Sequence, residues 1–458
     1  MRLSLIQAAR LVDGQLGDGV GKEREIGGVS IDSRQVGPGD LFVALTGDRH
    51  DGHDFVAEAL AAGAAAALVS RPVPEATGPL IIVEEPLRAL ARLAGWVRDV
   101  IDPLVVGITG STGKTSTKDL LTSIVAPKFR TVAARGSYNN EMGVPLTLLG
   151  MGADTEVVVC ELGARGRGQI SDLCQYVRPQ VGIVTNVGVA HYEQFGSQAT
   201  IAEAKAELPR SLPEAGTAIL NVDDPLVAAM VSETAAEVVT FGASREALLR
   251  AERVELDGRG RARFRMVWGY EAVHVELGVS GASQVANALA ACGAALALGL
   301  SLGECRDALM AATLSPWRME VEEVKGVMLI NDAYNANPAS VISALETCSA
   351  MVPPDGRLIA VLGAMAELGE IEAAEHRRVG AMAASCVTRL IVVGKRAVAL
   401  GLGARGAGAD DVRMAPDAGA ALDELEDLRP GDVVLFKGSR VAALEGLVGH
   451  LKERLTLR

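Results

Sequence analysis

Residues 104–116 read LVVGITGSTGKTS, an apolar run that passes through a glycine-rich turn into a polar segment rich in Thr and Lys. Glycines between a strand and a helix let backbone N–H groups and the helix N-terminus surround a phosphate. Lys114 would then pair with the β- and γ-phosphates of a nucleotide, and the Thr115 hydroxyl would ligate Mg²⁺. The spacing departs from the common motif, because five residues separate Gly107 from Gly113. The strand before the loop and the helix after it still predict a nucleotide-binding domain.

Similar apolar runs recur on both sides of this loop and alternate with helical patterns, which predicts an α/β fold with mostly parallel sheets. The expected strands lie in GDLFVAL, AAALVS, PLIIVEE, EVVVCELG, VGIVTNVG, TAILNVDD, GVMLINDAY, RLIAVLGAM, RLIVVGKR and DVVLFKGS. A chain of 458 residues is long enough for about three domains. We predict an N-terminal α/β unit over residues 1–102, a central P-loop domain over 103–315 and a Rossmann-like domain over 316–458.

Composition argues against several functional classes. A net charge of −13 and a pI near 5.1 disfavour nucleic-acid binding, which needs a basic surface. The N-terminus has no apolar core followed by a small-residue cleavage site, so we expect a cytoplasmic protein. The six cysteines are scattered and are predicted to be free thiols. The least polar stretch, residues 279–302, contains Gln284 and Asn287, and therefore predicts a buried helix and no membrane insertion.

Two further polar residues can reach the phosphate loop, and a third, Lys205, lies in a helical segment that follows them. Glu161 and His191 each follow an apolar strand, and the carboxyl ends of parallel strands meet at the ligand-binding edge of a sheet. A carboxylate oxygen and an imidazole nitrogen are both possible Mg²⁺ ligands. Each residue also has a simpler interpretation: a solvated glutamate, a surface histidine, and a Lys205 that forms a salt bridge with Glu203 or Glu207 on its own helix.

The short loop form TGSTGKT, followed by Glu161, His191 and Lys205 in this order, resembles the Mur ligases and their folate-ligase relatives. The resemblance implies an ATP-dependent carboxylate–amine ligase with two Mg²⁺ ions. Its catalytic residues would be Lys114, Lys205, His191 and Glu161. Its metal ligands would be Thr115, Glu161, His191 and Lys205, the last as a carbamate. The ATP-binding loop would be Gly110, Ser111, Thr112, Gly113, Lys114, Thr115 and Ser116.

Other segments extend the resemblance over nearly the whole chain. The DSR and DGHDF motifs look like the UDP-sugar domain of the family, with Asp32, Ser33 and Arg34 as substrate contacts. Asn139 and Asn140 match a substrate-facing loop, with a local Asx turn as the alternative. The resemblance implies ATP contacts at Asn287, Arg318, Asp332 and Asn335, and substrate contacts at Tyr334, Lys437 and Arg440. An interdomain salt bridge at Arg318 and a solvated basic loop around Lys437 remain open.

The YNANP segment, residues 334–338, resembles the member of the family that adds D-alanyl-D-alanine. The implied substrates are UDP-N-acetylmuramoyl-tripeptide and D-alanyl-D-alanine, joined through an acyl phosphate by a monomeric enzyme of peptidoglycan synthesis. The alternatives are a sibling ligase that adds one amino acid, a folylpolyglutamate synthase, and a nucleotide-hydrolysing switch. The third residue of the tripeptide stays open.

Two segments depart from the family pattern. Residues 281–287 keep only Asn287 of the usual G-R-H-N-x-x-N, which leaves the placement of adenine less defined. Residues 363–369 have Ala364 where the family has Asp in G-D-M-x-E-L-G, so a carboxylate expected to order nearby loops is missing.

Overall fold

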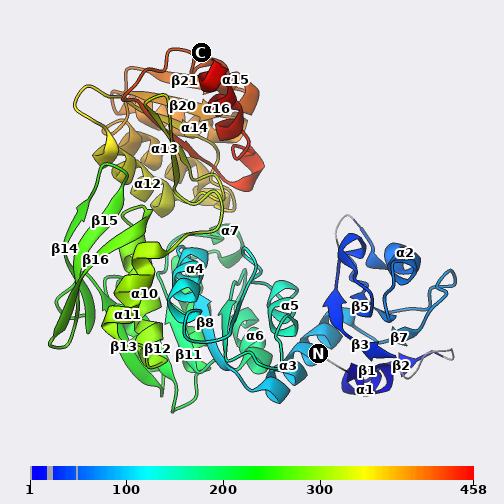
Figure 1. Ribbon diagram of the computed structural model, residues 1–458. Helices are drawn as coiled ribbons and strands as arrows, with labels where there is room; N and C mark the ends of the chain where they lie inside the picture. Colours follow the sequence, from blue (N-terminus) through cyan, green and yellow to red (C-terminus); the bar gives the residue numbers. More distant parts are fainter. Residues whose placement is uncertain (1–2, 18–23, 48–49, 458) are drawn as a thin grey trace. The chain divides into compact units, whose positions relative to one another are not determined.

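The computed structural model describes residues 3–17, 24–47 and 50–457 (Figure 1). Its contacts divide the chain into two compact units. The first comprises Met1–Gly107, Val125–Ala164 and Gln169–Val181, and the second comprises Ile108–Ile124, Arg165–Gly168 and Gly182–Arg458.

The first unit contains a five-stranded sheet in which β4, β5, β6 and β7 are parallel and β2 is antiparallel to β7. Its strands in spatial order are β2 (Gln15–Leu16), β7 (Leu80–Ile82), β6 (Ala66–Val69), β5 (Asp40–Val43) and β4 (Gly28–Ser30). Phe42 of β5 packs with Val56 and Ala59 of α2 (Val56–Ala61) in a buried core. The strands predicted in GDLFVAL, AAALVS and PLIIVEE are therefore confirmed.

The first unit also holds a two-stranded sheet and four further helices. The elements are β1 (Leu3–Ser4), β3 (Glu25–Ile26), α1 (Leu5–Leu11), α3 (Pro86–Ile101), α5 (Gly143–Leu149) and α6 (Gln169–Val177). Local sequence explains several of these boundaries. Ser4 and Gln7 form a capping box at the start of α1, and Pro86 occupies the first turn of α3, where its missing N–H costs nothing.

A nine-stranded sheet carries the phosphate loop. Its strands in spatial order are β16 (Glu271–Ser280), β15 (Arg261–Trp268), β14 (Leu249–Leu256), β13 (Glu237–Gly242), β12 (Thr217–Asn221), β11 (Val181–Val184), β8 (Leu104–Thr109), β10 (Val157–Glu161) and β9 (Thr131–Ala133). The pairs β9–β10, β12–β13 and β13–β14 are parallel, in keeping with the prediction of mostly parallel sheets, although strands β9, β13 and β14 were not themselves predicted. The antiparallel pairs β14–β15 and β15–β16 at one edge were not predicted either. Along β16 exposed and buried residues alternate, which is typical of a strand with one solvated face.

Six helices of the second unit accompany this sheet: α4 (Lys114–Val125), α7 (Tyr192–Phe195), α8 (Gln198–Arg210), α9 (Pro225–Ala228), α10 (Gln284–Ala297) and α11 (Leu302–Ala311). The apolar stretch 279–302 contributes α10, which is buried from Gln284 to Val285 and from Asn287 to Ala295. The prediction of a buried helix there is confirmed. Among the described residues, no helix is both long and apolar enough to cross a membrane.

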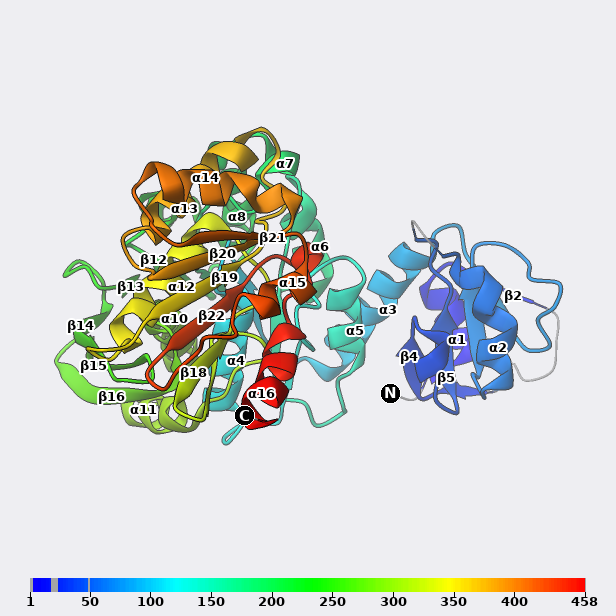
Figure 2. The same cartoon turned by 90° about the horizontal axis from the view of Figure 1, so that it is seen from above.

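The C-terminal sheet has helices on both faces (Figure 2). Its strands in spatial order are β17 (Glu320–Val324), β18 (Val327–Asn331), β22 (Val433–Lys437), β19 (Leu358–Leu362), β20 (Arg389–Val393) and β21 (Val412–Ala415). One core contains α12 (Pro338–Met351), α13 (Glu372–Ala383) and α14 (Val398–Gly406), and the other contains α15 (Ala418–Asp423) and α16 (Leu447–Leu457). Among the described strands of this sheet, only β17 is antiparallel to its neighbour, so the Rossmann-like prediction is confirmed.

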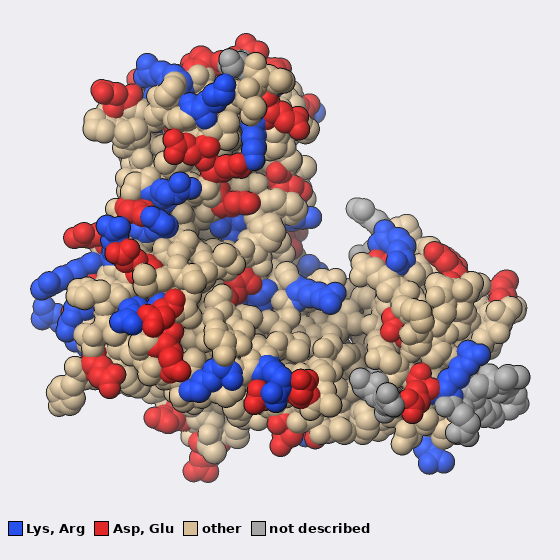
Figure 3. Space-filling model, in the orientation of Figure 1, with Lys and Arg blue, Asp and Glu red and all other residues tan. Residues whose placement is uncertain are grey.

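Charged side chains are mixed on the surface and paired inside. On the face drawn in Figure 3, acidic side chains lie among the basic ones over much of the second unit. Asp432 is fully buried and accepts hydrogen bonds from Arg357 at 3.0 and 2.6 Å, which raises the pKa of the guanidinium. The six cysteines are free thiols, as predicted, and burial raises the pKa of Cys160 to about 12.

The loop of residues 363–369 is ordered although Ala364 lacks the family carboxylate. The backbone N–H and the hydroxyl of Ser439 both donate to the Ala364 carbonyl, at 2.9 and 2.7 Å. The Met365 N–H donates to His376 Nε2 at 3.0 Å, and His376 Nδ1 lies 2.7 Å from the Glu372 carbonyl. A carbonyl only accepts, so Nδ1 carries the proton and the fully buried imidazole is neutral. Two neutral side chains, Ser439 and His376, therefore order this loop in place of the family carboxylate.

His376 should make this domain sensitive to acid. Burial lowers the pKa of its imidazole below the ordinary 6.5, so the unfolded chain takes up the proton more readily than the folded one. The contribution of neutral His376 to the free energy of unfolding is complete above pH 6.5. It is lost as the pH falls from there through the lowered pKa of the folded state. We expect His376→Ala to reduce the free energy of unfolding by about 2 kcal/mol at pH 8, and this deficit to shrink toward pH 5. Denaturant unfolding across this range measures it. Exposed His450→Ala is the control, and a deficit independent of pH would contradict the assignment.

Candidate active site

The phosphate loop runs from the end of β8 into α4, where Thr115 and Ser116 are buried in the first turn. Gly110 has a φ of +147°, and a Cβ at this position would lie 1.9 Å from Thr185 Oγ1. No side chain fits there. Lys114 folds back over the loop, and its Nζ donates to the Gly110 carbonyl at 2.7 Å.

Asn186, just beyond β11, holds the middle of the loop. Its carbonyl accepts from the Ser111 N–H at 2.9 Å, and its Oδ1 accepts from the Thr112 N–H at 2.9 Å. Its Nδ2 donates to the carbonyl and hydroxyl oxygens of Thr112, at 3.2 and 2.8 Å. The N–H groups of Ser111 and Thr112 therefore already donate to Asn186. The first N–H groups of a helix have no acceptor within the helix and can bind a phosphate, which favours the first turn of α4. No specific role at the site was predicted for Asn186, although a polar residue directly after a buried strand indicates one.

Asn287 lies beside the same helix start. Its Nδ2 donates to Gln284 Oε1 at 2.9 Å, and its Oδ1 is 3.4 Å from the Thr117 hydroxyl that donates to it. Gln284 replaces a family residue in the altered 281–287 segment and supplies the partner that fixes the buried amide. The orientation of the Asn287 amide therefore depends on Gln284, a neighbour that the family pattern does not predict.

In the first unit, Glu161 closes strand β10 and is only 1% exposed. Asn139 Nδ2 donates to Glu161 Oε1 at 2.7 Å, and the Asn139 carbonyl accepts from the Gly163 N–H at 2.7 Å. Asn140 Oδ1 accepts from the Gly143 N–H at 3.0 Å, which is the local turn considered as the alternative for this pair. Asn139 thus orients the expected metal-binding carboxylate, and Asn140 organises the start of α5.

His191 precedes α7 and contacts Glu367 of the 363–369 loop. His191 Nδ1 lies 2.6 Å from Glu367 Oε2, and the two side chains are 28% and 35% exposed. The hydrogen bond from His191 lowers the pKa of the Glu367 carboxyl, so this carboxyl is ionised at neutral pH. The sequence placed His191 at the site but gave no role to Glu367.

Lys205 lies in α8 and is only 2% exposed. Lys205 is therefore not a solvent-exposed side chain. Glu203 on the same helix pairs with Arg167 at 2.5 Å, and Glu207 accepts from the Gly168 N–H at 2.6 Å. A buried ammonium is costly unless compensated, so Lys205 occupies a position where its charge state matters.

Half-buried Asp332 and buried Lys437 form an ion pair at the ends of β18 and β22. Lys437 Nζ lies 2.5 Å from Asp332 Oδ2 and donates to the Asn335 carbonyl at 3.0 Å. Asp332 Oδ1 also accepts from the Met319 N–H at 3.1 Å. Lys437 is 3% exposed, so the solvated basic loop is wrong for this residue. The pair links the YNANP segment to the strand end that carries Lys437.

Two arginines share one aromatic ring. The Arg318 guanidinium lies 4.1 Å from the Tyr334 ring centroid, and that of Arg440 lies 5.9 Å from it and 5.3 Å from the Trp317 ring. Such contacts are favourable and orient the guanidinium planes. Arg440 is exposed, and in the described part of the chain no carboxylate lies within 4.0 Å of it. Trp317 was not predicted as a site residue.

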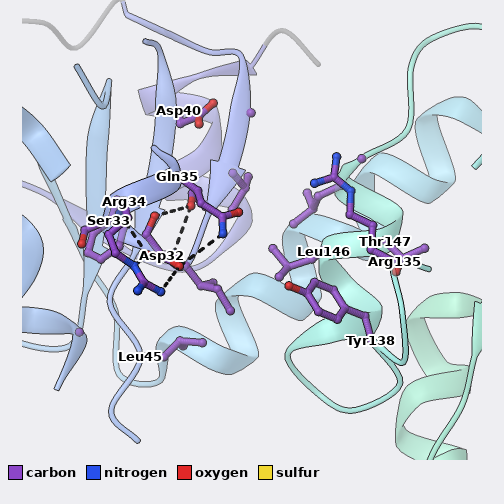
Figure 4. Close-up of a pocket in the computed structure, with 18 of the residues that line it drawn as sticks. Asp32, Ser33, Arg34, Gln35, Asp40, Leu45, Arg135, Tyr138, Leu146 and Thr147 are labelled. Carbon is purple, nitrogen blue, oxygen red and sulfur yellow. Dashed lines mark hydrogen bonds and ion pairs between the residues drawn. The ribbon is translucent and has the colours of Figure 1, made fainter. Parts of the chain in front are cut away.

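A cavity of about 1260 Å³ in the first unit is lined by Asp32, Ser33 and Arg34 together with Arg135 and Tyr138 (Figure 4). Arg34 donates to both carboxylate oxygens of Asp32, at 2.8 and 2.7 Å, and these bonds lower the pKa of Asp32. Figure 4 shows the Asp32–Arg34 turn on one wall and the exposed Tyr138 with Arg135 on the other. The sequence identified the first wall and missed the second, which directly precedes Asn139.

Asn186 should control nucleotide affinity by holding the loop. In Asn186→Asp the two donor hydrogen bonds to Thr112 are lost and a negative charge appears beside the phosphate loop, so we expect ADP to bind about 10-fold more weakly. Calorimetric titration with ADP measures this. Gln194→Glu, which adds the same charge on exposed α7, is the control, and unchanged or tighter binding by Asn186→Asp would contradict the role.

Comparison with known proteins agrees with this architecture. Residues 25–96, 108–295 and 317–440 match, in order, the Mur ligase family catalytic domain, the Mur ligase middle domain and the Mur ligase glutamate ligase domain. The chain is 41% identical to the UDP-N-acetylmuramoyl-tripeptide--D-alanyl-D-alanine ligase of Mycobacterium tuberculosis, with 98% of each chain covered. MurF from Acinetobacter baumannii superposes with a TM-score of 0.90 at 31% identity over 99% of each chain. MurF from Thermotoga maritima in complex with ADP gives 0.83 at 30% identity, over 94% of this chain and 98% of that one. The predicted three-domain α/β architecture is thereby confirmed, and the chain belongs to the Mur ligase family.

Proposed function

We propose that this chain joins D-alanyl-D-alanine to UDP-N-acetylmuramoyl-tripeptide at the expense of ATP, in peptidoglycan synthesis. The phosphate loop is the observation that supports the proposal most directly, because Lys114 and the loop backbone are already held in position by hydrogen bonds. The chain also matches a UDP-N-acetylmuramoyl-tripeptide--D-alanyl-D-alanine ligase over 98% of its length. The YNANP segment favours this activity over a sibling ligase or a folylpolyglutamate synthase.

Amide formation from a carboxylate needs an activated leaving group. ATP phosphorylates the terminal carboxylate of the tripeptide, and the amine of the dipeptide attacks the resulting acyl phosphate and expels phosphate. Lys114 and Arg318 neutralise charge on the transferring phosphoryl group. Arg318 is suited to this because Tyr334 fixes its plane, and Arg440 on the same ring is suited to a carboxylate of the dipeptide. Asp332 and Asn335 contact ATP, and the buried partner Lys437 holds Asp332 in place.

The donor set fits Mg²⁺. Thr115, Glu161, His191 and a carbamate on Lys205 would hold two ions, which supply charge neutralisation and alignment of the reacting oxygens. Among the described residues there is no group of three or more His, Cys, Asp and Glu side chains that can hold a metal. Glu161 and His191 would therefore need further oxygen ligands, which a hydroxyl and a carbamate provide.

The cavity of the first unit suits the UDP part of the substrate. Arg34 and Arg135 offer positive charge for a pyrophosphate, and exposed Tyr138 offers a ring for stacking against a base. We assign domains to residues 1–102, 103–315 and 316–458, and infer a monomeric enzyme that works in the cytoplasm, where ATP and nucleotide sugars are available.

The activity is tested by measuring ADP release with UDP-N-acetylmuramoyl-tripeptide present. We expect strong stimulation by D-alanyl-D-alanine and little by D-alanine, because a dipeptide site gains its binding energy from both residues. Tripeptides ending in diaminopimelate or lysine identify the accepted donor. Lys114→Ala, which removes a charge partner of the phosphates, is the inactive control. Equal stimulation by the two amines would point to a sibling ligase, and ADP release independent of both would point to a nucleotide-hydrolysing switch.

The proposed carbamate on Lys205 is tested with two variants, one that removes the amine and one that keeps a positive charge but cannot be carbamylated. The neutral amine reacts with CO₂, and the carbamate carries a negative charge toward the metal. Lys205→Ala and Lys205→Arg should both lose nearly all turnover, and short carboxylic acids should partly restore the alanine variant. Circular dichroism checks that both variants fold. An active Lys205→Arg variant would exclude the carbamate.

A further inference from the structure

The contact between His191 and Glu367 joins two segments that are 176 positions apart in sequence, His191 before α7 and Glu367 in the loop after β19. His191 Nδ1 is buried and has no hydrogen-bond partner of standard geometry among the described residues. Glu367 Oε2 approaches it to 2.6 Å. Two lone pairs at this distance would repel, so Nδ1 carries a proton and Nε2 is the nitrogen left unprotonated in the neutral ring.

Backbone conformation and a backbone hydrogen bond fix the positions of His191 and Glu367. His191 and Glu367 have φ values of +60° and +62°, a left-handed conformation that is uncommon for residues with a Cβ. The Glu193 N–H donates to the Glu367 carbonyl at 3.1 Å, which joins the two loops beside the side-chain pair. Gly369, at φ +54°, passes so close to Glu193 that a Cβ would lie 3.1 Å from its Cα.

The Glu367 loop is itself rigid. Ser439 binds the Ala364 carbonyl, His376 binds the Met365 N–H, and Met365 and Leu368 are fully buried on either side of Glu367. A carboxylate placed this firmly can set the orientation of the ring that it contacts.

We propose that Glu367 is a positioning residue for His191, which fixes the ring with Nδ1 protonated and Nε2 free to accept a cation. This rests on the proposed function, in which His191 is a metal ligand. The arrangement follows a general pattern, in which a histidine ligand donates its other ring N–H to a carboxylate that sets its tautomer. Here the carboxylate comes from the C-terminal Rossmann-like sheet and the histidine from the central one, so the ring is correctly set only when these two segments are in contact.

The tautomer is measured directly by nuclear magnetic resonance of ¹⁵N-histidine-labelled full-length protein. The chain has six histidines, and His191→Gln identifies the signals of His191. We expect Nδ1 protonated and Nε2 unprotonated in the unsubstituted protein and in Glu367→Gln, whose amide oxygen can still accept. Glu367→Ala should shift His191 toward the Nε2-protonated form. Glu370→Ala, an exposed neighbour on the same segment, is the matched control and should change nothing.

Kinetics and Mn²⁺ binding complete the test. Glu367→Ala should lower kcat about 10-fold to 100-fold with little change in KM for ATP, and Glu367→Gln should recover most of this loss. An unchanged His191 tautomer in Glu367→Ala, or Nε2 protonated in the unsubstituted protein, would overturn the proposal. Mn²⁺ should broaden the His191 signals selectively. If it does not, while the tautomer still depends on Glu367, the positioning claim stands and the metal-ligand role in the proposed function falls.

Discussion

The close approach of the phosphate loop to the neighbouring strand end is the constraint on which the rest of the site depends. Gly110 passes Thr185 at a distance that leaves no room for a side chain, and this lets Asn186 reach the next two residues of the loop. The loop is consequently held in shape by the protein itself, directly before the N-terminus of α4. Preorganisation of this kind spares the reorganisation that would otherwise oppose charge stabilisation.

An acidic chain must bind anionic substrates through local sites, and two different devices support such sites here. Lys437 is buried against Asp332. Its positive charge is neutralised by this carboxylate, and the ion pair fixes the position of Asp332. Arg318 and Arg440 are held by the flat faces of Tyr334 and Trp317, and aromatic contacts orient them without neutralising their charge. Lysine and arginine differ here because a planar guanidinium can stack on an aromatic ring while its N–H donors stay free, whereas an ammonium cannot.

The loop of residues 363–369 shows how a missing family residue can be replaced. Ala364 has no carboxylate, yet its carbonyl is held by Ser439 and the next N–H is held by buried His376. Such compensation uses neutral groups from the segment just after β22, 75 positions away, and from α13, 11 positions away. The loop keeps the rigidity that places Glu367 against His191, although a local motif comparison suggests the opposite.

Local pattern in the sequence determined the alternation of strands and helices and the phosphate loop with Lys114 and Thr115. These features depend on residues a few positions apart, so spacing and residue type are enough to reveal them. Tertiary structure alone decided that Lys205 and Lys437 are buried, that Arg135 and Tyr138 complete a cavity, and that Glu367 meets His191. The antiparallel strands β14 to β16 belong with these, since pairing at a sheet edge is set by the path of the chain. Contacts between distant segments depend on how whole elements pack, and no local spacing encodes that packing.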